Sequence, residues 1–343
     1  GIMQLRNTSN NGYVNLFSLA GGPEFSVNGQ IAGKNIGGGA NNANGNLAFG
    51  AAALDASVSG QSNTALGDNA CTNLTTANNN VAVGTSALTG CTTGGGNSFV
   101  GSHAGDAITS GTNNTGIGIN AAGSISTHNN TVAIGSNALG LCTQNDNLAV
   151  GAFTADAVTT ATGITAVGSF ALGSHTTGAS CTAVGINSFL NSTTGTLNTG
   201  IGVATGYSTT TAQQNTFVGH HAGYSFTTGS FNTAVGSIAL DAGTDASYNT
   251  AVGYSALSAA TGSLNTAVGS TALLNVSSGS SNVGVGVNAG DAITTGTGNT
   301  AVGAFAMEHV TTNSGNTAVG SSALYFNTGA GNTAVGQNAG HGN

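Results

Sequence analysis

Histidine is the residue type in this chain best suited to metal binding or proton transfer, and the spacing of its seven copies argues against both. They are His103, His128, His175, His220, His221, His309 and His341. Only His220 and His221 are neighbours, and adjacent residues of a strand point to opposite faces. A site with three or four protein ligands is therefore not expected within one chain. We interpret each His as a surface residue, although a trimer could bring three copies of one His together on its axis.

A set of aspartates takes the same place in the repeat described below, among them Asp106, Asp156, Asp241 and Asp291. Such carboxylates could bind calcium or, acting in pairs, cleave glycosides. The nearest two are three repeats apart, roughly 14 Å at strand spacing, which is too far for a carboxylate pair. The Gly-Gly-x-Gly-x-Asp signature of calcium-binding β-rolls is absent. A turn aspartate that caps a corner is the simpler interpretation.

Tyr207 and Tyr224 share that position on successive repeats, with His220 and His221 beside them. Exposed aromatic rings with polar neighbours can stack on a sugar, so these four residues are a candidate glycan contact. The alternative is a tyrosine ladder that fills a corner. No Ser-His-Asp group can be assembled, because no carboxylate falls near a His in register. We predict no catalytic residue, no cofactor site and no metal site.

The four cysteines suggest a structural role. Only Cys71 and Cys91 are close enough in register for a disulfide to be conceivable, whereas Cys91 and Cys142 are three repeats apart. Cys181 lies in a different position of the repeat. Buried thiols are the expected state of all four.

Composition excludes several classes of protein. The 343 residues include 58 Gly but only two Lys or Arg and ten Asp or Glu. So few cations cannot neutralise a phosphate backbone, which excludes nucleic-acid binding by a basic surface. The apolar runs are only a few residues long, so no helical membrane insertion is expected.

A repeat organises most of the chain. Its closing Gly recurs 18 times between Gly50 and Gly336, at intervals of 17 residues in fourteen cases and 16 in three. Counted from that Gly, position −1 is always Val, Ile, Leu or Phe, and −2 is almost always Ala or Gly. Position −3 is mostly Thr, and −4 is mostly Asn. Each copy therefore predicts a three-residue strand, a glycine turn and a polar return.

These columns predict an all-β parallel β-solenoid with one coil per 16–17 residues, because a unit so short can bury apolar surface only against its neighbours. Asn at −4 is expected to form a ladder between coils, from Asn198, Asn215, Asn232, Asn249, Asn265, Asn282, Asn299, Asn316 and Asn332. The valines at −1 are expected to fill the interior, namely Val218, Val235, Val252, Val268, Val285, Val302, Val319 and Val335. Val235→Asp would then bury an unpaired charge.

The pattern also bears on assembly and on domain limits. A rod with 3% charged residues has little to keep it unassociated, so a side-by-side homotrimer is expected, with Ala at −2 facing the neighbouring chains.

Residues 1–33 differ in composition and form a cap or junction segment, in which 13–17 favour a strand. Residues 34–343 form the solenoid of about 18 coils. Its last coil is unfinished, which predicts a segment of a longer fibre.

The columns resemble the head repeats of trimeric autotransporter adhesins, most closely at Asn130-Thr131-Val132-Ala133-Ile134-Gly135. The commoner Asn-Thr-Ala-Val-Gly form, as at 232–236, is similar to repeats of bacteriophage tail fibres. The resemblance covers 46–340 and implies a trimeric fibre displayed outside the cell, on a virion or cell surface. The coil here is longer than the adhesin coil, so its return loop must differ.

The predicted solenoid is compatible with three candidate functions. The first is a non-catalytic structural fibre or adhesin segment that attaches to a host surface, where glycans are the candidate partners. The second is an ice-binding solenoid, which uses a flat array of Thr. With Val inside, Thr at −3 would also be inside, and the later Thr-Thr-Gly region is too irregular in spacing for a second array. The third is a polysaccharide-cleaving, tailspike-like solenoid, which normally needs loop insertions that this repeat lacks.

Overall fold

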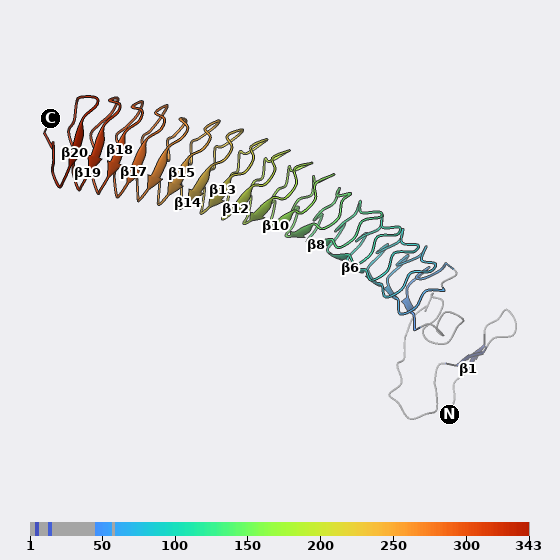
Figure 1. Ribbon diagram of the computed structural model, residues 1–343. Coiled ribbons are helices and arrows are strands. Elements are labelled where there is room, and N and C mark those ends of the chain that lie inside the picture. The colour runs from blue at the N-terminus through green and yellow to red at the C-terminus, as the bar shows by residue number, and fades with distance from the viewer. Residues whose placement is uncertain (1–3, 7–12, 16–44, 57–58, 343) are drawn as a thin grey trace.

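The computed structural model describes residues 4–6, 13–15, 45–56 and 59–342 (Figure 1). Near the N-terminus, β1 (Gln4–Arg6) pairs with β2 (Tyr13–Asn15) as an antiparallel hairpin. The strand expected at 13–17 is thus present over its first three residues. The remainder of the 1–33 segment, and the first residues assigned to the solenoid, lie outside the described residues.

The solenoid is a single stack of parallel strands, and the predicted all-β fold is confirmed. Its 18 three-residue strands pair in register through 17 parallel pairings, Thr233 with Thr250 and Val235 with Val252 for example. No helix occurs in the described ranges. The strands are β3 Leu47–Phe49, β4 Thr64–Leu66, β5 Val81–Val83, β6 Ser98–Val100, β7 Thr115–Ile117, β8 Val132–Ile134, β9 Leu148–Val150, β10 Thr165–Val167, β11 Thr182–Val184, β12 Thr199–Ile201, β13 Thr216–Val218, β14 Thr233–Val235, β15 Thr250–Val252, β16 Thr266–Val268, β17 Val283–Val285, β18 Thr300–Val302, β19 Thr317–Val319 and β20 Thr333–Val335.

The stack forms a long, gently curved rod, with β3 and β20 at its two ends (Figure 1). Each interval between strands is one coil of 16 or 17 residues, giving about 17 coils. At a strand spacing of about 4.8 Å, 17 intervals span roughly 80 Å. The solenoid is therefore an elongated rod.

The two faces of each strand are reversed relative to the expectation. The residue at −2 points inward, and Ala234, Ala251 and Ala267 are fully buried. The residue at −1 points outward. Val235, Val252, Val268 and Val319 are 36–38% exposed and Val335 is 71% exposed, whereas Val218, Val285 and Val302 are half-buried. The predicted valine core is therefore wrong. Small residues fill the inward column of the strands, and larger side chains such as Leu240 and Leu257 at +4 complete the interior.

The interior is narrow because the strand layer packs directly on the residues at +3 and +4. Phe99 shows how little room there is. A Cβ added at Gly105, position +4 of the same coil, would lie 2.7 Å from the Phe99 ring, and one added at Gly116 would overlap it. Phe217 at −2 is likewise accompanied by Gly223 at +4. A large residue on one layer thus requires glycine on the other, as expected for a close-packed core.

The asparagines at −4 are buried, apart from the half-buried Asn332, and join the coils by hydrogen bonds. The Asn232 side chain accepts from the backbone N–H of Asn249 (2.9 Å) and donates to Asn215 Oδ1 (3.1 Å) and to the Ala246 carbonyl (2.9 Å). Similar bonds recur where Asn follows Asn in this column. Because each buried backbone group needs a partner, the ladder satisfies atoms of three successive coils.

Candidate functional site

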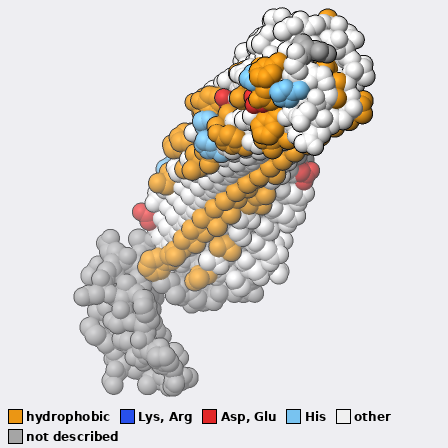
Figure 2. Space-filling model, turned by 90° about the vertical axis from the view of Figure 1, so that its left-hand side faces the viewer, with side chains coloured by type: hydrophobic (Ala, Val, Ile, Leu, Met, Phe, Trp, Pro, Cys, Tyr) orange, Lys and Arg blue, Asp and Glu red, His pale blue; other side chains and the backbone are white. Residues whose placement is uncertain are grey.

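The most extensive surface feature is the outward side of the strand layer. We call it the Thr–Val face and define it as the side chains at −3 and −1 of β3 to β20. Every residue at −1 is Val, Ile, Leu or Phe, and neither column contains a charged residue. Figure 2 shows an unbroken hydrophobic stripe that follows the rod. Such a patch is far longer than the scattered apolar residues of an ordinary protein surface.

The threonines of this face have hydroxyls without a protein partner. In the described chain, no hydroxyl of a Thr at −3, such as Thr233, Thr250 or Thr300, takes part in a side-chain hydrogen bond. These threonines are half-buried except for the exposed Thr216 and Thr333, and they stand beside the valine column. The face therefore presents parallel rows of hydroxyls and methyl groups. Rows repeat at the coil spacing of about 4.8 Å, and the two columns are separated by about 7 Å along each strand.

A second threonine column behaves differently. At +8, threonines recur every 16 or 17 residues, and their hydroxyls donate to the carbonyl of the next coil. Thr176 donates to the Thr193 carbonyl (2.9 Å) and Thr193 to the Thr210 carbonyl (3.2 Å). The expectation that the Thr-Thr-Gly region is too irregular to form an array is wrong. Its hydroxyls bond within the rod, so the column links successive coils.

The aromatic residues singled out in the sequence form one cluster. The rings of Tyr207 and Tyr224 stack with centroids 5.0 Å apart, and His221 stacks on Tyr224 at 4.5 Å. His220 and His221 also stack, at 4.0 Å, so the expectation that they point apart is wrong. The alternation rule holds for extended backbone, whereas His221 has a φ of +57°. Tyr207 and Tyr224 cover each other's facing sides, which leaves a sugar only the outer faces of the stack.

Carboxylates do lie near histidines, contrary to the sequence expectation. Burial raises the pKa of Asp241, and the charges of His221 and His220 oppose that shift. Glu308, which was not predicted as a site residue, occupies position +5 one coil after Asp291. Asn288 Nδ2 donates to Glu308 Oε1 at 3.4 Å, and a hydrogen bond with Glu308 raises the pKa of Tyr325. His309, Tyr325, Phe326 and His341 complete this cluster near the C-terminal end.

The Asp291 carboxyl is expected to make the stability of the fold depend on pH. Burial, together with the negative charge of Glu308, raises its pKa to about 6, while the Ala292 N–H and His309 act in the opposite direction. The folded pKa exceeds the unfolded value, so ionisation opposes folding. The resulting penalty is absent below about pH 4 and develops as pH rises through 6. Asp291→Asn should therefore raise the melting temperature at pH 7.5 but not at pH 4, as measured by circular dichroism. An equal effect at both pH values would contradict this origin.

The remaining chemistry-bearing residues are structural. All four cysteines are buried free thiols, and burial raises the pKa of Cys71 and, to about 11, of Cys91. His175 is not on the surface as expected. It is fully buried, with Nε2 2.6 Å from the Gly178 carbonyl oxygen and Nδ1 3.0 Å from Ser192 Oγ. Among the described residues, no group of three or more His, Cys, Asp or Glu is arranged to hold a metal ion.

Comparison with known proteins yields no family whose model matches the chain and no curated protein with significant similarity. Within the described residues, no helix has the length and apolar character needed to cross a membrane. The fold places the chain among parallel β-solenoid repeat proteins. Its function must be argued from the surface of the rod.

Proposed function

We propose that this chain is a non-catalytic structural rod of an extracellular fibre or adhesin, in which three parallel copies pack along their Thr–Val faces. The observation that carries the proposal is the uncharged apolar column at −1, present in all 18 repeats and exposed or half-buried in a single chain. Water-exposed apolar surface of this length favours association. The chain would hold attachment surfaces away from a virion or cell.

The size of the face fits a stable interface. A stack of roughly 80 Å with an exposed strand width of about 10 Å presents roughly 800 Å². That is about the area that one partner contributes to a standard protein interface. The absence of charge on both columns means that no ionised group would be desolvated on contact, which removes the main cost of burying polar surface.

A three-fold arrangement suits one apolar column per chain. Parallel rods in register would bring the same −1 residue of three chains to a common axis, layer after layer. The threonine hydroxyls would flank that axis, where they can bond to each other or to trapped water. Symmetric association is the usual outcome for identical chains. In this arrangement Val, rather than Ala as first expected, meets the neighbouring chains.

Crosslinking tests the arrangement. In the Val252→Cys variant, the introduced thiols of the three chains should lie close together at the common axis. The four native thiols are buried, so they should not react. A short bis-maleimide should join Val252→Cys chains efficiently. The matched control is Ser258→Cys, six residues further along the same coil and outside the Thr–Val face, which should crosslink no more than wild type. Equal crosslinking of both variants would argue against the proposed contact face.

Ice binding is the second candidate, and one observation favours it. Thr at −3 was expected inside the rod, but these unpaired hydroxyls lie outside, beside methyl groups on a regular sheet. A free, flat face is required for that function, whereas a fibre would cover the face. Thermal hysteresis and ice-crystal shaping decide between them. Activity from a monomer, lost in Thr250→Tyr, would replace the fibre proposal.

A further inference from the structure

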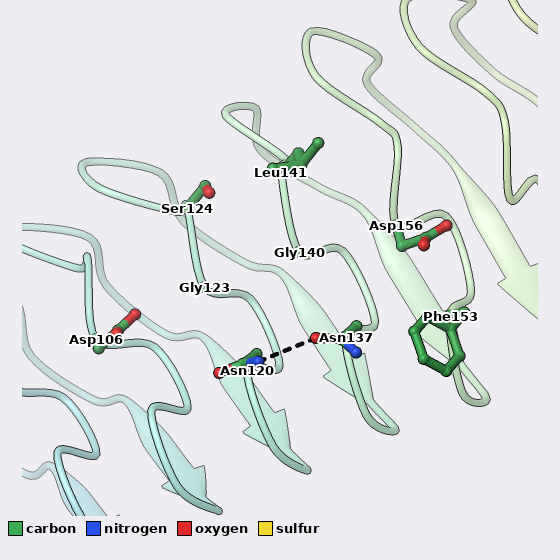
Figure 3. A pocket seen from close by; sticks show the side chains of 9 residues that line it. All are labelled: Asp106, Asn120, Gly123, Ser124, Asn137, Gly140, Leu141, Phe153 and Asp156. Atoms are coloured by element: carbon green, nitrogen blue, oxygen red, sulfur yellow. Dashed lines mark hydrogen bonds between the residues drawn. The ribbon is translucent and has the colours of Figure 1, made fainter.

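A notch opens on the surface at four successive coils, between β6 and β10. It is lined by Asp106, Asn120, Gly123, Ser124, Asn137, Gly140, Leu141, Phe153 and Asp156 and encloses about 440 Å³. Figure 3 shows Gly123 and Gly140 between the two aspartates. All four of these residues occupy position +5. The notch exists because two successive coils lack a side chain at +5, a position that carries Asp, Glu, Tyr, Leu, Thr, Ser or His in every other coil except that of Gly173.

The fold itself does not require these glycines. Neither Gly123 nor Gly140 has a positive φ. An added Cβ would meet nothing closer than the Asn120 carbonyl oxygen at 3.3 Å for Gly123, or the Asn137 carbonyl oxygen at 3.4 Å for Gly140. By contrast, glycines at the coil corner have positive φ and no room for a side chain. The gap at +5 therefore calls for another explanation, and space for a ligand supplies one.

The lining combines hydroxyl-binding groups with one aromatic surface. The Asp106 carboxyl extends along the rod toward Gly123, whereas that of Asp156 extends beyond the notch (Figure 3). Asn120 Nδ2 donates to Asn137 Oδ1 at 3.1 Å along one side. Phe153 is stacked on Phe170 at 5.4 Å, which covers one face of its ring. The ring remains 37% exposed and lines the notch beside Asn137, which holds the equivalent position of the preceding coil.

We infer that this notch binds a neutral disaccharide unit of a surface glycan. An amphipathic sugar ring can place its C–H face on Phe153 and its hydroxyls on Asp106, Asn120, Asn137 and Ser124. The distance from Asp106 to Asp156 spans three coils, roughly 14 Å, which exceeds one pyranose ring and suits two linked rings.

The charges select against acidic ligands. The only Lys and Arg of the chain are Lys34 and Arg6, and neither lines the notch. Two aspartates do line it, and burial raises the pKa of both. A sialylated, uronic or phosphorylated sugar would bring a second anion to a site without a cation. The same three-coil separation makes the two carboxyls too distant to act as a glycosidase pair.

Nuclear magnetic resonance titration of the intact chain with maltose, cellobiose, lactose, diacetylchitobiose and sialyllactose tests the inference. We expect saturable binding of at least one neutral disaccharide, with a Kd of about 1 mM, and weaker binding of sialyllactose. Gly123→Tyr should raise that Kd at least tenfold, because Tyr fills the notch with a residue that the fold accepts at Tyr207 and Tyr224. Ser258→Tyr places the same residue at +5 outside the notch and should leave the Kd unchanged.

The inference deepens the attachment role proposed above, and its outcome can be separated from that proposal. Asp106→Asn keeps the volume of the notch and should weaken binding several-fold, which covers the case in which Gly123→Tyr misfolds. Lack of binding to all neutral probes, binding unaffected by both variants, or preference for sialyllactose would overturn the inference. A trimer that binds no sugar contradicts only the notch, whereas sugar binding by a monomer contradicts only the assembly.

Discussion

Gly236→Ala is expected to lower the free energy of local unfolding around β14 by about 4 kcal/mol, combining a strained backbone with overpacking. Gly236 has a φ of +141° at the corner of its coil. An added Cβ would lie 2.6 Å from the carbonyl carbon of Gly253 and closer still to its oxygen. Both atoms belong to backbone, so relief requires that two coils separate. Hydrogen exchange of the amides in β14 and β15 measures the effect.

Gly298→Ala is the matched control for that substitution. Its φ is +66°, but an added Cβ would meet nothing within 4 Å, and Phe231 and Leu264 occupy the equivalent position with positive φ. We expect a cost of about 1 kcal/mol, which is the penalty for a left-handed residue alone. Similar exchange rates in the two variants would show that contact between corner glycines does not hold the coils in register.

Asn232→Ala should cost about 3–5 kcal/mol, because it leaves several buried groups without partners. The Asn249 N–H loses its acceptor, the Ala246 carbonyl loses a donor, and Asn215 Oδ1 loses the side-chain amide. No water can replace these bonds without opening the core. The denaturation midpoint, followed by circular dichroism, should fall, and exchange protection should be lost first in the coils on either side.

Asn120→Ala is the control for the ladder. Asn120 also bonds to the next coil, through Asn137 Oδ1 at 3.1 Å, but it is exposed, so water can take over its bonds. Ala52 and Ala204 occupy the same left-handed position. A loss of about 1 kcal/mol or less is expected. If Asn232→Ala were equally mild, burial of the asparagine column would not be what stabilises the stack.

The repeat length, the strand positions and the solenoid fold can be predicted from the sequence alone, because 18 copies of the repeat share the same pattern. It did not predict which strand face is inside, since hydrophobicity favours Val over Ala for a core. The narrow coil decides otherwise, as its two layers approach too closely for a column of valines. One signal was present, because Phe99 and Phe217 at −2 are each followed by glycine at +4. That pairing indicates contact across the interior.

The clusters of His, Tyr and carboxylate side chains were harder to predict, because the rule that successive residues point to alternate faces fails outside the strands. His221 and its equivalents at +2 have positive φ, so neighbouring residues there can share a face, as His220 and His221 do. Glu308 was overlooked at +5, although its distance from Gly303 places it one coil after Asp291. The notch was not predicted, because the register places Gly123 and Gly140 at +5 but does not show that the surrounding side chains leave a space there.

The reversed strand faces change the expectation for the valine column. Val235→Asp, which would disrupt a buried core, now places a charge at a position that is 37% exposed in the single chain. We expect the coil to fold and the association of chains to fail, because three carboxylates would meet in one layer of the assembly. Introducing Asp at Val235, Val252 and Val268 together should strengthen this effect.

Light scattering of the intact chain, compared with this triple variant at micromolar concentration, tests the central claim most directly. The account predicts three times the chain mass for the wild type. It predicts a monomer with an unchanged β-sheet circular dichroism spectrum for the variant carrying Val235→Asp, Val252→Asp and Val268→Asp. A monodisperse wild-type monomer, or a variant that remains trimeric, would contradict assembly through the Thr–Val face.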